Sequence, residues 1–565
     1  MTPAVGPELS VVIPTRGRPQ QLHRCLESLS GQIGLSDSFE VVVVIDGPDK
    51  ATEQMLDALE PPFPMQVFVQ AHGGAGPARN RGAKAARGRF LLFVDDDMVA
   101  DAPLVGAHLA VQRKSGGVVG IGRIERTLSE QPARWSRSRQ RVWQRHYDRL
   151  EAGREPRFTD CYGGNLSVPR DAFLKIGGFE PDLFPSEDVE LGYRLAAAGN
   201  RFVYVPDAIA REEDRETLQG FLADAHRRGV LSVTLYERHP AMLPQLGIGG
   251  AGQLGKHWVG LRMFLTALRV PSRPLTLLGT VLGLDRLTNE WVAFLYTYCY
   301  WRGVRTAVDR DTWRRLQRGA AILMYHAVGE DGEPPSRYVL PIRRFKRQME
   351  WLRFRRYNVI SLEELVAHFR QHRLLPEKTI VLTFDDGYSD NVELALPVLT
   401  RLGFPATMFL VSRSPGKPIW ECDPEVKRRP LLRLTEARLL RERLSFGAHT
   451  RTHPRLPDLA PAEIEREVAG SRSDLESVLD MTVSTFAYPY GETNPEVQTA
   501  VEDAEFLSGC GITQGLNWHA TDLYDLRRLE VRGSDSLPRF ALTIWLAGRP
   551  SVLGRRLRRT RLARR

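Results

Sequence analysis

The sequence predicts an α/β protein with two units, each built on a mostly parallel sheet, and a helical segment between them. Short β-rich runs alternate with helix-like stretches over about the first 240 residues. The alternation stops over residues 241–318, which are rich in Gly, aromatic residues and Arg, and it restarts near Ala320. Strands that alternate with helices are typical of parallel sheets, whose ligands bind at the carboxyl ends of the strands. We therefore expect four parts, over residues 1–240, 241–318 (a helical connector), 319–548 and 549–565 (a basic tail).

The apolar runs of the two units predict their elements in order. In the first unit we expect strands at Ser10–Ile13, Val41–Ile45, Gln66–Val69 and Phe90–Val94, with helices over Gln20–Leu29 and Ala78–Ala86. In the second unit we expect strands at Ala321–Tyr325, Thr379–Phe384 and Ala406–Val411. Each run is short, rich in β-branched or aromatic residues and bounded by Gly, Pro or Asp, as strands commonly are.

Composition and charge exclude several classes of protein. Hydrophobic residues make up 42% of the chain and charged residues 26%, which is ordinary for globular domains and excludes global disorder. The net charge is +10, but residues 549–565 hold eight Arg and no acid, so the rest of the chain carries only 10 − 8 = +2. No groove-reading element accompanies this charge, so we expect no nucleic-acid partner.

Cysteine usage and the absence of targeting patterns bear on the compartment. The five Cys lie far apart without CxxC spacing, which indicates a reducing environment. The first residues lack the pattern of a secretory signal, and no apolar run approaches the ~18 residues of a membrane-spanning helix. The expected location is cytoplasmic. The aromatic connector and the basic tail leave peripheral contact with the membrane as an open alternative.

A group of carboxylates follows the fourth strand of the first unit. Side chains alternate along an extended chain, so Asp95 and Asp97 are expected on the same side, where both can reach one hard divalent cation beside a diphosphate. Taken alone, such a triplet is more often a solvated acidic turn. Here it is accompanied by Gly-rich and acidic motifs at Gly73–Asn80, Gly163–Asn165 and Ser186–Leu191.

With these motifs in this order, residues 8–215 resemble an inverting family-two glycosyltransferase with a GT-A fold. The resemblance implies a nucleotide-sugar donor, a glycan or lipid-linked acceptor, and Mg²⁺ or Mn²⁺. Its implied donor-site residues are Asp46 at the base of the nucleotide, Arg79 at the nucleotide, Asp95 and Asp97 at the metal, and Gly163, Gly164 and Asn165 along the donor–acceptor cleft. Asp188 would deprotonate the acceptor hydroxyl, although an acid here is equally typical of a helix N-terminus. The Gln-x-x-Arg-Trp motif of processive synthases is missing after Asp188, which favours single-sugar transfer.

The second unit carries its own set of polar residues. The strand Thr379–Phe384 ends in Asp385 and Asp386, and His449 and His453 follow, spaced so that both imidazoles can share one helical or turn face. Two histidines and one aspartate can hold a metal that keeps positions open for water and substrate, as catalytic metals do. A pair of histidines without the aspartates would more often be structural.

These motifs resemble those of the polysaccharide deacetylases, family-four carbohydrate esterases, over residues 320–540. The resemblance implies a (β/α) barrel, Asp385 as general base, Asp386, His449 and His453 as ligands of Zn²⁺ or another divalent metal, and the backbone N–H of Tyr490 as oxyanion donor. Two features depart from the family. Ala487 stands where an Arg often orients the base, and the late Leu-x-His motif is missing, which leaves the general acid undecided. His326 and His519 are candidates for it, although a structural role is favoured for each.

The sequence therefore predicts a bifunctional carbohydrate enzyme of envelope or exopolysaccharide synthesis. One domain would transfer a sugar, and the other would remove an N-acetyl group. Two alternatives stay open. In one, the second domain is a degenerate, non-catalytic sugar-binding module, and in the other the chain is a membrane-surface assembly scaffold.

Overall fold

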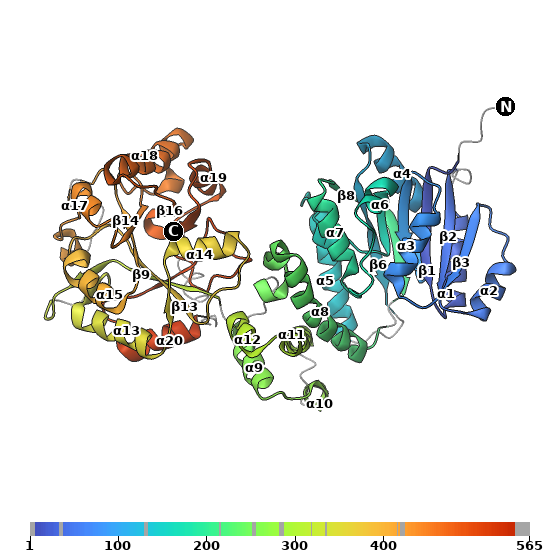
Figure 1. Ribbon diagram of the computed structural model, residues 1–565, viewed down its shortest axis with the longest axis horizontal. Coiled ribbons are helices and arrows are strands. Elements are labelled where there is room, and N and C mark those ends of the chain that lie inside the picture. The colour runs from blue at the N-terminus through green and yellow to red at the C-terminus, as the bar shows by residue number, and fades with distance from the viewer. Residues whose placement is uncertain are drawn as a thin grey trace, which may run out of the picture. The chain divides into compact units, whose positions relative to one another are not determined.

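The computed structural model describes residues 6–32, 38–128, 134–213, 216–250, 256–281, 288–317, 319–333, 336–414, 416–418 and 424–547 (Figure 1). The chain divides into two compact units. Unit 1 comprises Met1–Leu231 and Pro271–Gly303, and unit 2 comprises Ser232–Val270 and Val304–Arg565. The segment expected as a connector is thus shared between the two units, and the boundaries at residues 240, 318 and 548 remain predictions.

Unit 1 is built on a mixed eight-stranded sheet with the order β3-β2-β1-β4-β7-β6-β8-β5. The strands are β1 (Leu9–Thr15), β2 (Phe39–Asp46), β3 (Met65–Gln70), β4 (Phe90–Val94), β5 (Met98–Ala100), β6 (Val119–Thr127), β7 (Asn165–Pro169) and β8 (Phe202–Glu213). β1 pairs in parallel with β2 and β4, whereas β7 is antiparallel to both β4 and β6. The carboxyl ends of β1, β2 and β4 therefore lie at one edge of the sheet.

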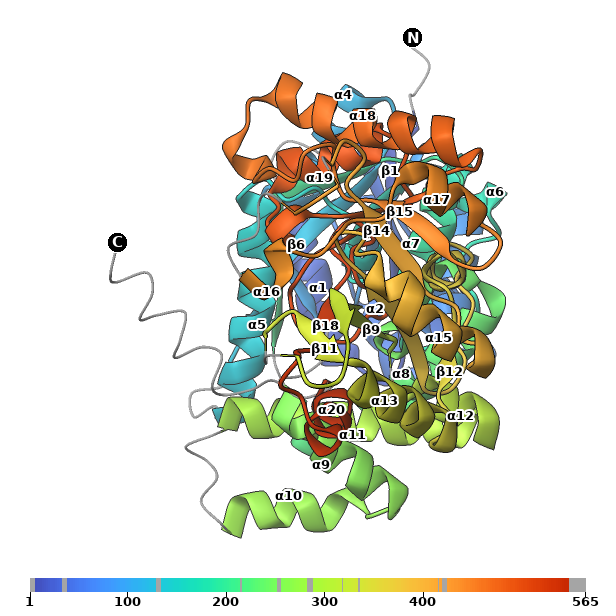
Figure 2. The same ribbon diagram turned by 90° about the vertical axis from the view of Figure 1, so that its left-hand side faces the viewer.

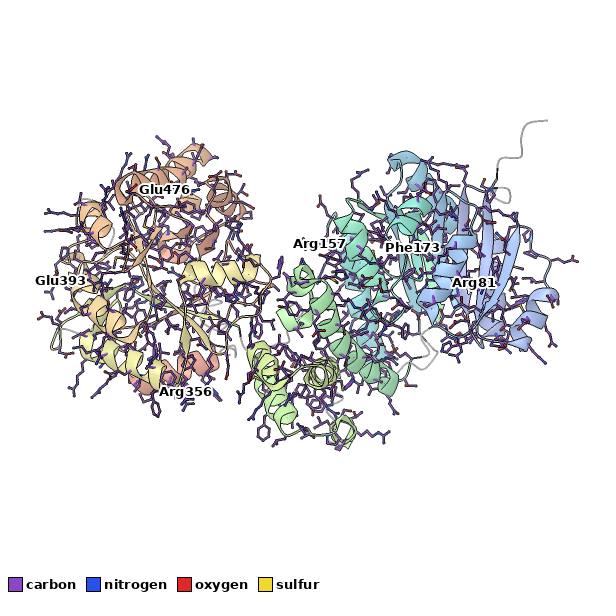
Figure 3. All side chains as sticks on the ribbon, in the orientation of Figure 1. Arg81, Arg157, Phe173, Arg356, Glu393 and Glu476 are labelled. Atoms are coloured by element: carbon purple, nitrogen blue, oxygen red, sulfur yellow. The ribbon has the colours of Figure 1, made fainter. Side chains whose placement is uncertain are left out.

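Helices cover both faces of this sheet (Figure 1). Alternate residues of β1 show why: Val11 and Ile13 pack with one set of helices, and Val12 packs with the other. The first set is α1 (Pro19–Ser30), α2 (Lys50–Asp57), α4 (Leu104–Ser115) and α5 (Arg134–Glu151). The second set is α3 (Ala75–Ala85), α6 (Arg170–Lys175) and α7 (Glu187–Ala197). Phe173 of α6, labelled in Figure 3, is buried in the second layer.

Unit 2 is built on a parallel, barrel-shaped sheet with the order β17-β16-β15-β14-β13-β9-β18. Its strands are β9 (Ala321–Tyr325), β13 (Thr379–Phe384), β14 (Thr407–Leu410), β15 (Ser445–Ala448), β16 (Thr485–Ala487), β17 (Ser508–Cys510) and β18 (Arg528–Glu530). β12 (Asn358–Val359) pairs with β13, and β10 (Ala327–Gly329) pairs with β11 (Val339–Pro341). Hydrogen bonds from Gly509 and Gly511 to the carbonyls of Leu523 and Leu526 bring β17 next to the segment that leads into β18.

Helices surround the unit 2 sheet, and apolar side chains from successive strands meet in its core. Ile322, Val381, Phe409, Ala487 and Cys510 form one cluster with α14 (Leu362–Arg370). Outer helices pack on a second cluster: α13 (Ile342–Phe354), α15 (Leu396–Leu402), α17 (Leu434–Leu439), α18 (Pro461–Leu479), α19 (Pro495–Asp503) and α20 (Leu537–Leu546). The short helix α16 spans Pro424–Lys427. The expected fold class, α/β with a barrel-type second domain, is confirmed.

The segment between the two sheets is helical. It contains α8 (Leu218–Arg238), α9 (Lys256–Ala267), α10 (Ser272–Val281), α11 (Thr288–Ala307) and α12 (Arg310–Leu316). On α11, Trp291, Tyr298 and Trp301 are buried. These three aromatic side chains are core residues and cannot also form the lipid-facing patch that the sequence left open for the connector. None of the helices in the described ranges combines the length and the apolar character that crossing a bilayer requires.

Candidate active sites

In unit 2, the first candidate site begins where β13 ends. Asp385 follows the strand directly, and its backbone N–H donates to the carbonyl of Tyr325 on β9 at 2.9 Å. Asp386 has a φ of 70°, in the left-handed region, which turns its side chain away from the strand direction. Tyr388, fully buried, donates its hydroxyl to Oδ2 of Asp386 at 3.1 Å and leaves Oδ1 facing elsewhere.

The second part of this site comes from the loop after β15. His449 and His453 lie on a turn that includes Thr450 at φ 66° and His453 at φ 63°, so the turn face rather than a helix brings the two rings together. Oδ1 of Asp386 lies 3.4 Å from Nε2 of His449 and 3.3 Å from Nε2 of His453. All three residues are buried, and their ligand atoms lie within 4.8 Å of one another.

This cluster fits a divalent metal by the chemistry of its donors. The Nδ1 atom of His449 lies 2.7 Å from the carbonyl of Ala487, so Nδ1–H donates there and the lone pair of Nε2 faces Asp386. Two imidazole nitrogens and one carboxylate are a common ligand set for Zn²⁺. Among the described residues, no other compact group of three or more His, Cys, Asp or Glu side chains has this arrangement.

A residue that sequence reasoning missed completes the site. Arg528, at the start of β18, is 1% exposed, and its Nη1 lies 2.6 Å from Oδ1 of Asp385. Its Nε donates to the carbonyl of Gly511 at 2.8 Å, and its guanidinium stands 5.8 Å from the centre of the Phe409 ring. Arg528 thus supplies Asp385 with an arginine partner, although Ala487 stands at the position of the family's third-motif Arg.

Two opposing influences act on the pKa of Asp385, namely its burial and its contact with Arg528. Burial raises the pKa of Asp385, but the charge of Arg528 and its hydrogen bond to Asp385 act in the opposite direction, and the pKa lies below its ordinary value. Asp385 is therefore ionised at neutral pH and can accept a proton. The sequence gives no local signal for Arg528, since the short run from Leu526 to Val531 also contains the charged residues Arg527 and Glu530.

The remaining predicted residues of unit 2 lie around this centre. Tyr490 has φ 58° and ψ 1°, and its half-exposed ring lies 4.8 Å from that of His453. Its role as oxyanion donor stays a prediction. The ring of His326 packs against that of Tyr338, with 4.7 Å between centroids. His519 instead bonds to the carbonyl of Arg373 and packs against Phe369, which supports the structural role favoured for it.

In unit 1, a second candidate site lies at the carboxyl end of β4. Asp95 and Asp97 are each about one-third exposed, whereas Asp96 between them is buried and accepts a hydrogen bond from Thr15 at 2.7 Å. Asp95 lies 2.5 Å from Arg79, whereas Arg18 reaches both Asp97, at 2.9 Å, and Asp96, at 3.2 Å. Asp96 and Asp97 lie in a turn after β4, so strand alternation does not describe this segment. Their role as metal ligands stays a prediction.

Arg79 lies between Asp95 and the acidic pair Glu187 and Asp188 on α7. It is 5% exposed on α3, and its Nη1 lies 3.4 Å from Glu187. Burial and then the charge of Asp188 raise the pKa of Glu187 to about 7. Burial also raises the pKa of Asp188, against the lowering effect of Arg228 on α8. A carboxylate whose proton affinity is raised is a stronger base, as the deprotonation of an acceptor hydroxyl requires.

Gly163 and Gly164 leave room for these charged side chains. A Cβ at Gly163 would stand 3.0 Å from Cζ of Arg79, and one at Gly164 would stand 2.8 Å from Oδ2 of Asp95. The backbone N–H of Gly163 also lowers the pKa of Asp188. The two glycines are therefore next to both ends of the charged group, and their role in lining the cleft stays a prediction.

Asn165 and Asp46, the two other predicted donor-site residues of unit 1, make hydrogen bonds within the protein. Asn165 is 1% exposed, and its amide bonds to the carbonyls of Arg123 and Ala208 and to Nε2 of His108. This differs from the expectation that its side chain lines the cleft, because those bonds hold it inside the sheet. Asp46, at the end of β2, accepts hydrogen bonds from the backbone of Gly73 and Gly74, both at 2.8 Å. It anchors the loop before α3, and its contact with a nucleotide base stays a prediction.

Comparison with known proteins agrees with the assignment of two domains. Residues 7–231 match the family model described as glycosyltransferase-like family 2, and residues 372–508 match that of polysaccharide deacetylase. The Bacillus subtilis protein YxkH, which is named as a candidate polysaccharide deacetylase, is 27% identical to this chain. The match covers 40% of this chain and 76% of YxkH.

Two further proteins extend the comparison. Validoxylamine A glucosyltransferase of Streptomyces hygroscopicus is 28% identical over 42% of this chain, and the chain spans only 58% of that protein. The structure of the Streptococcus pyogenes deacetylase PplD is matched over 40% of this chain and 98% of its own, with 23% identity and a TM-score of 0.36.

The chain is therefore an enzyme that joins two carbohydrate-active domains. Its N-terminal part is a glycosyltransferase domain of family 2, and its C-terminal part is a polysaccharide deacetylase domain. Proteins of both families typically use divalent metal ions.

Proposed function

We propose that unit 2 is an active, metal-dependent N-deacetylase of an acetamido sugar. The observation that carries this proposal is the buried cluster of Asp386, His449 and His453 beside the Asp385–Arg528 pair. A divalent metal held by the cluster would supply a Lewis acid that polarises the amide carbonyl. Asp385 would take the proton from the attacking water, and Arg528 would hold its carboxylate ionised and oriented. The intact arginine contact also opposes the alternative of a degenerate binding module.

For unit 1, we propose inverting transfer of one sugar from a nucleotide-sugar donor to a glycan or lipid-linked acceptor. The support is the charged group that runs from Asp95 through Arg79 to Glu187 and Asp188. Asp95 and Asp97 would bind Mg²⁺ or Mn²⁺ beside the diphosphate. Arg79 would partly neutralise the negative charge of Asp95 and Glu187. Asp188 would accept the proton of the acceptor hydroxyl.

The two activities would act on one pathway of envelope or exopolysaccharide synthesis. Because the domains share a chain, the product of one reaction meets the second site at a raised effective concentration. An N-acetylated hexosamine is the sugar that both reactions can have in common. We also propose peripheral contact with the membrane face at which lipid-linked acceptors are found.

The test is metal content of the purified full chain together with acetate release from N-acetylglucosamine oligomers. About one tightly bound divalent ion and released acetate are expected. A chain that holds no metal after reconstitution and releases no acetate would favour the binding-module alternative. Donor turnover with Mn²⁺, measured on the same preparation, tests the transferase proposal separately.

A further inference from the structure

We propose that one surface of unit 2, formed by α13 and α20, docks on a bilayer that contains anionic lipid. This surface, here called the α13–α20 surface, consists of the exposed residues of 343–356 and of α20. The proposal gives the peripheral membrane contact a location, and it depends on neither enzymatic activity.

The two helices form one continuous surface. They lie side by side along one edge of unit 2, where Arg356 is labelled in Figure 3 (Figures 1 and 2). The ring of Trp351 on α13 packs edge-on against that of Phe540 on α20, with 5.9 Å between centroids. Phe345 and Met349 of α13 and Ile544 of α20 are buried in the core of the unit. The opposite sides of both helices therefore face outward together.

The outward side of α13 is strongly basic. Within residues 343–356, seven residues are basic and Glu350 is the single acid. All seven basic residues are exposed: Arg343, Arg344, Lys346, Arg347, Arg353, Arg355 and Arg356. Glu350 itself pairs with Arg401 of α15 at 3.0 Å. Such a density of positive charge attracts an anionic surface, by roughly 1 kcal/mol for each Lys or Arg close to it.

Large apolar side chains are exposed among these charges. Phe354 is 80% exposed, and Leu542 and Trp545 on α20 are 49% and 48% exposed. On α20 the exposed residues Arg539, Leu542 and Trp545 recur every three residues, opposite to Phe540 and Ile544. An apolar group surrounded by basic residues is typical of surfaces that enter the headgroup region of a bilayer.

The apolar side chains decide between two kinds of anionic partner. A soluble polyanion neutralises charge but has no apolar interior in which Phe354 and Leu542 can be buried. A bilayer offers both, because anionic headgroups lie above acyl chains. Charge and apolarity thus favour the lipid surface.

The test uses the full chain and two kinds of vesicle, phosphatidylcholine alone and phosphatidylcholine mixed with phosphatidylglycerol. Co-sedimentation is expected with the mixed vesicles and not with the neutral ones. The variant Phe354→Ser/Leu542→Ser/Trp545→Ser should bind the mixed vesicles at least about tenfold more weakly, because apolar area is no longer buried. The matched control is Leu439→Ser on α17, whose leucine is 82% exposed outside this surface and whose variant should bind as the parent does.

Two further measurements complete the test. The charge reversal Arg347→Glu/Arg353→Glu leaves the core unchanged and should also weaken binding, so the proposal does not depend on the folding of one variant. Acetate release and thermal unfolding, measured on each variant, separate loss of docking from loss of enzyme. Parental vesicle binding by the triple serine variant would overturn the proposal. So would tighter binding to heparin than to mixed vesicles, which would assign the surface to a soluble polyanion.

Discussion

Replacing Arg528 by methionine removes the partner of Asp385 while nearly preserving the volume of the side chain. The structure places the two groups 2.6 Å apart, with 1% and 5% of their side chains exposed. A charge-assisted hydrogen bond in such a place contributes about 1.5–3 kcal/mol. At about 1.4 kcal/mol for each factor of ten in rate, kcat for acetate release should fall about 10- to 150-fold.

The same substitution should lower the stability of unit 2. Breaking a buried ion pair by removing one partner typically costs about 3–5 kcal/mol, because the other charge remains buried. Removing both charges in Asp385→Asn/Arg528→Met should therefore restore much of the stability without restoring activity. Arg528→Lys retains a positive charge but loses the fixed geometry of the guanidinium, so an intermediate rate is expected.

The assay is steady-state acetate release from N-acetylglucosamine oligomers, with metal content and thermal unfolding measured on each preparation. Arg527→Met is the matched control, because it removes an arginine from the neighbouring position that makes no contact with Asp385. A parental kcat in Arg528→Met, with parental metal content, would refute the positioning role. Equal losses in both arginine variants would point to a general effect on β18 instead.

Three further outcomes are expected. Asp385→Asn should abolish acetate release with metal content near that of the parent, whereas Asp386→Asn should lose the metal, since its Oδ1 faces both imidazoles; loss of metal from both variants would contradict this division of roles. Glu187→Gln should reduce the pH dependence of stability. Its pKa rises from 4.5 unfolded to about 7 folded, so the native state binds the extra proton, and stability is lost as pH rises from about 4.5 through 7, by at most about 3 kcal/mol. Thermal unfolding at about pH 5 and about pH 8 measures this, and an unchanged difference between the two values would argue against a buried, raised carboxyl. Asp97→Asn should raise the Mn²⁺ concentration needed for donor turnover and lower its maximum, because one of the two carboxylates proposed to bind the metal is neutralised; parental turnover across a Mn²⁺ titration would remove Asp97 from the metal site.

Local patterns predicted the strands and the charged groups that directly follow them. The expected strand Thr379–Phe384 is observed as β13 with the same bounds, and Phe90–Val94 is observed as β4. The two aspartates of unit 2 were predictable because they directly follow the expected strand Thr379–Phe384. His449 and His453 were predicted from their spacing and from the resemblance to the polysaccharide deacetylases, since no strand was expected directly before them.

Side-chain direction and long-range pairing were not predictable in the same way. Asn165 follows two glycines and was expected in the cleft, but its amide satisfies buried carbonyls within the sheet. Arg528 reaches Asp385 only because β18 pairs with β9, and β9 pairs with β13. The basic character of α13 is visible in the sequence. Its adjacency to the apolar residues of α20 depends on the fold.

Because Arg528 lies far from Asp385 in the sequence, the deacetylase site can be completed only after most of unit 2 has been synthesised. The ion pair joins residues 143 positions apart, and Arg528 lies beyond residue 508, where the matched family segment ends. As the chain emerges from the ribosome, both aspartates and both histidines are made well before their partner arginine. Closing so long a segment carries a larger entropic cost than the local contacts do. During synthesis, and in any chain cut between residues 508 and 528, every named motif is present while the base still lacks its arginine.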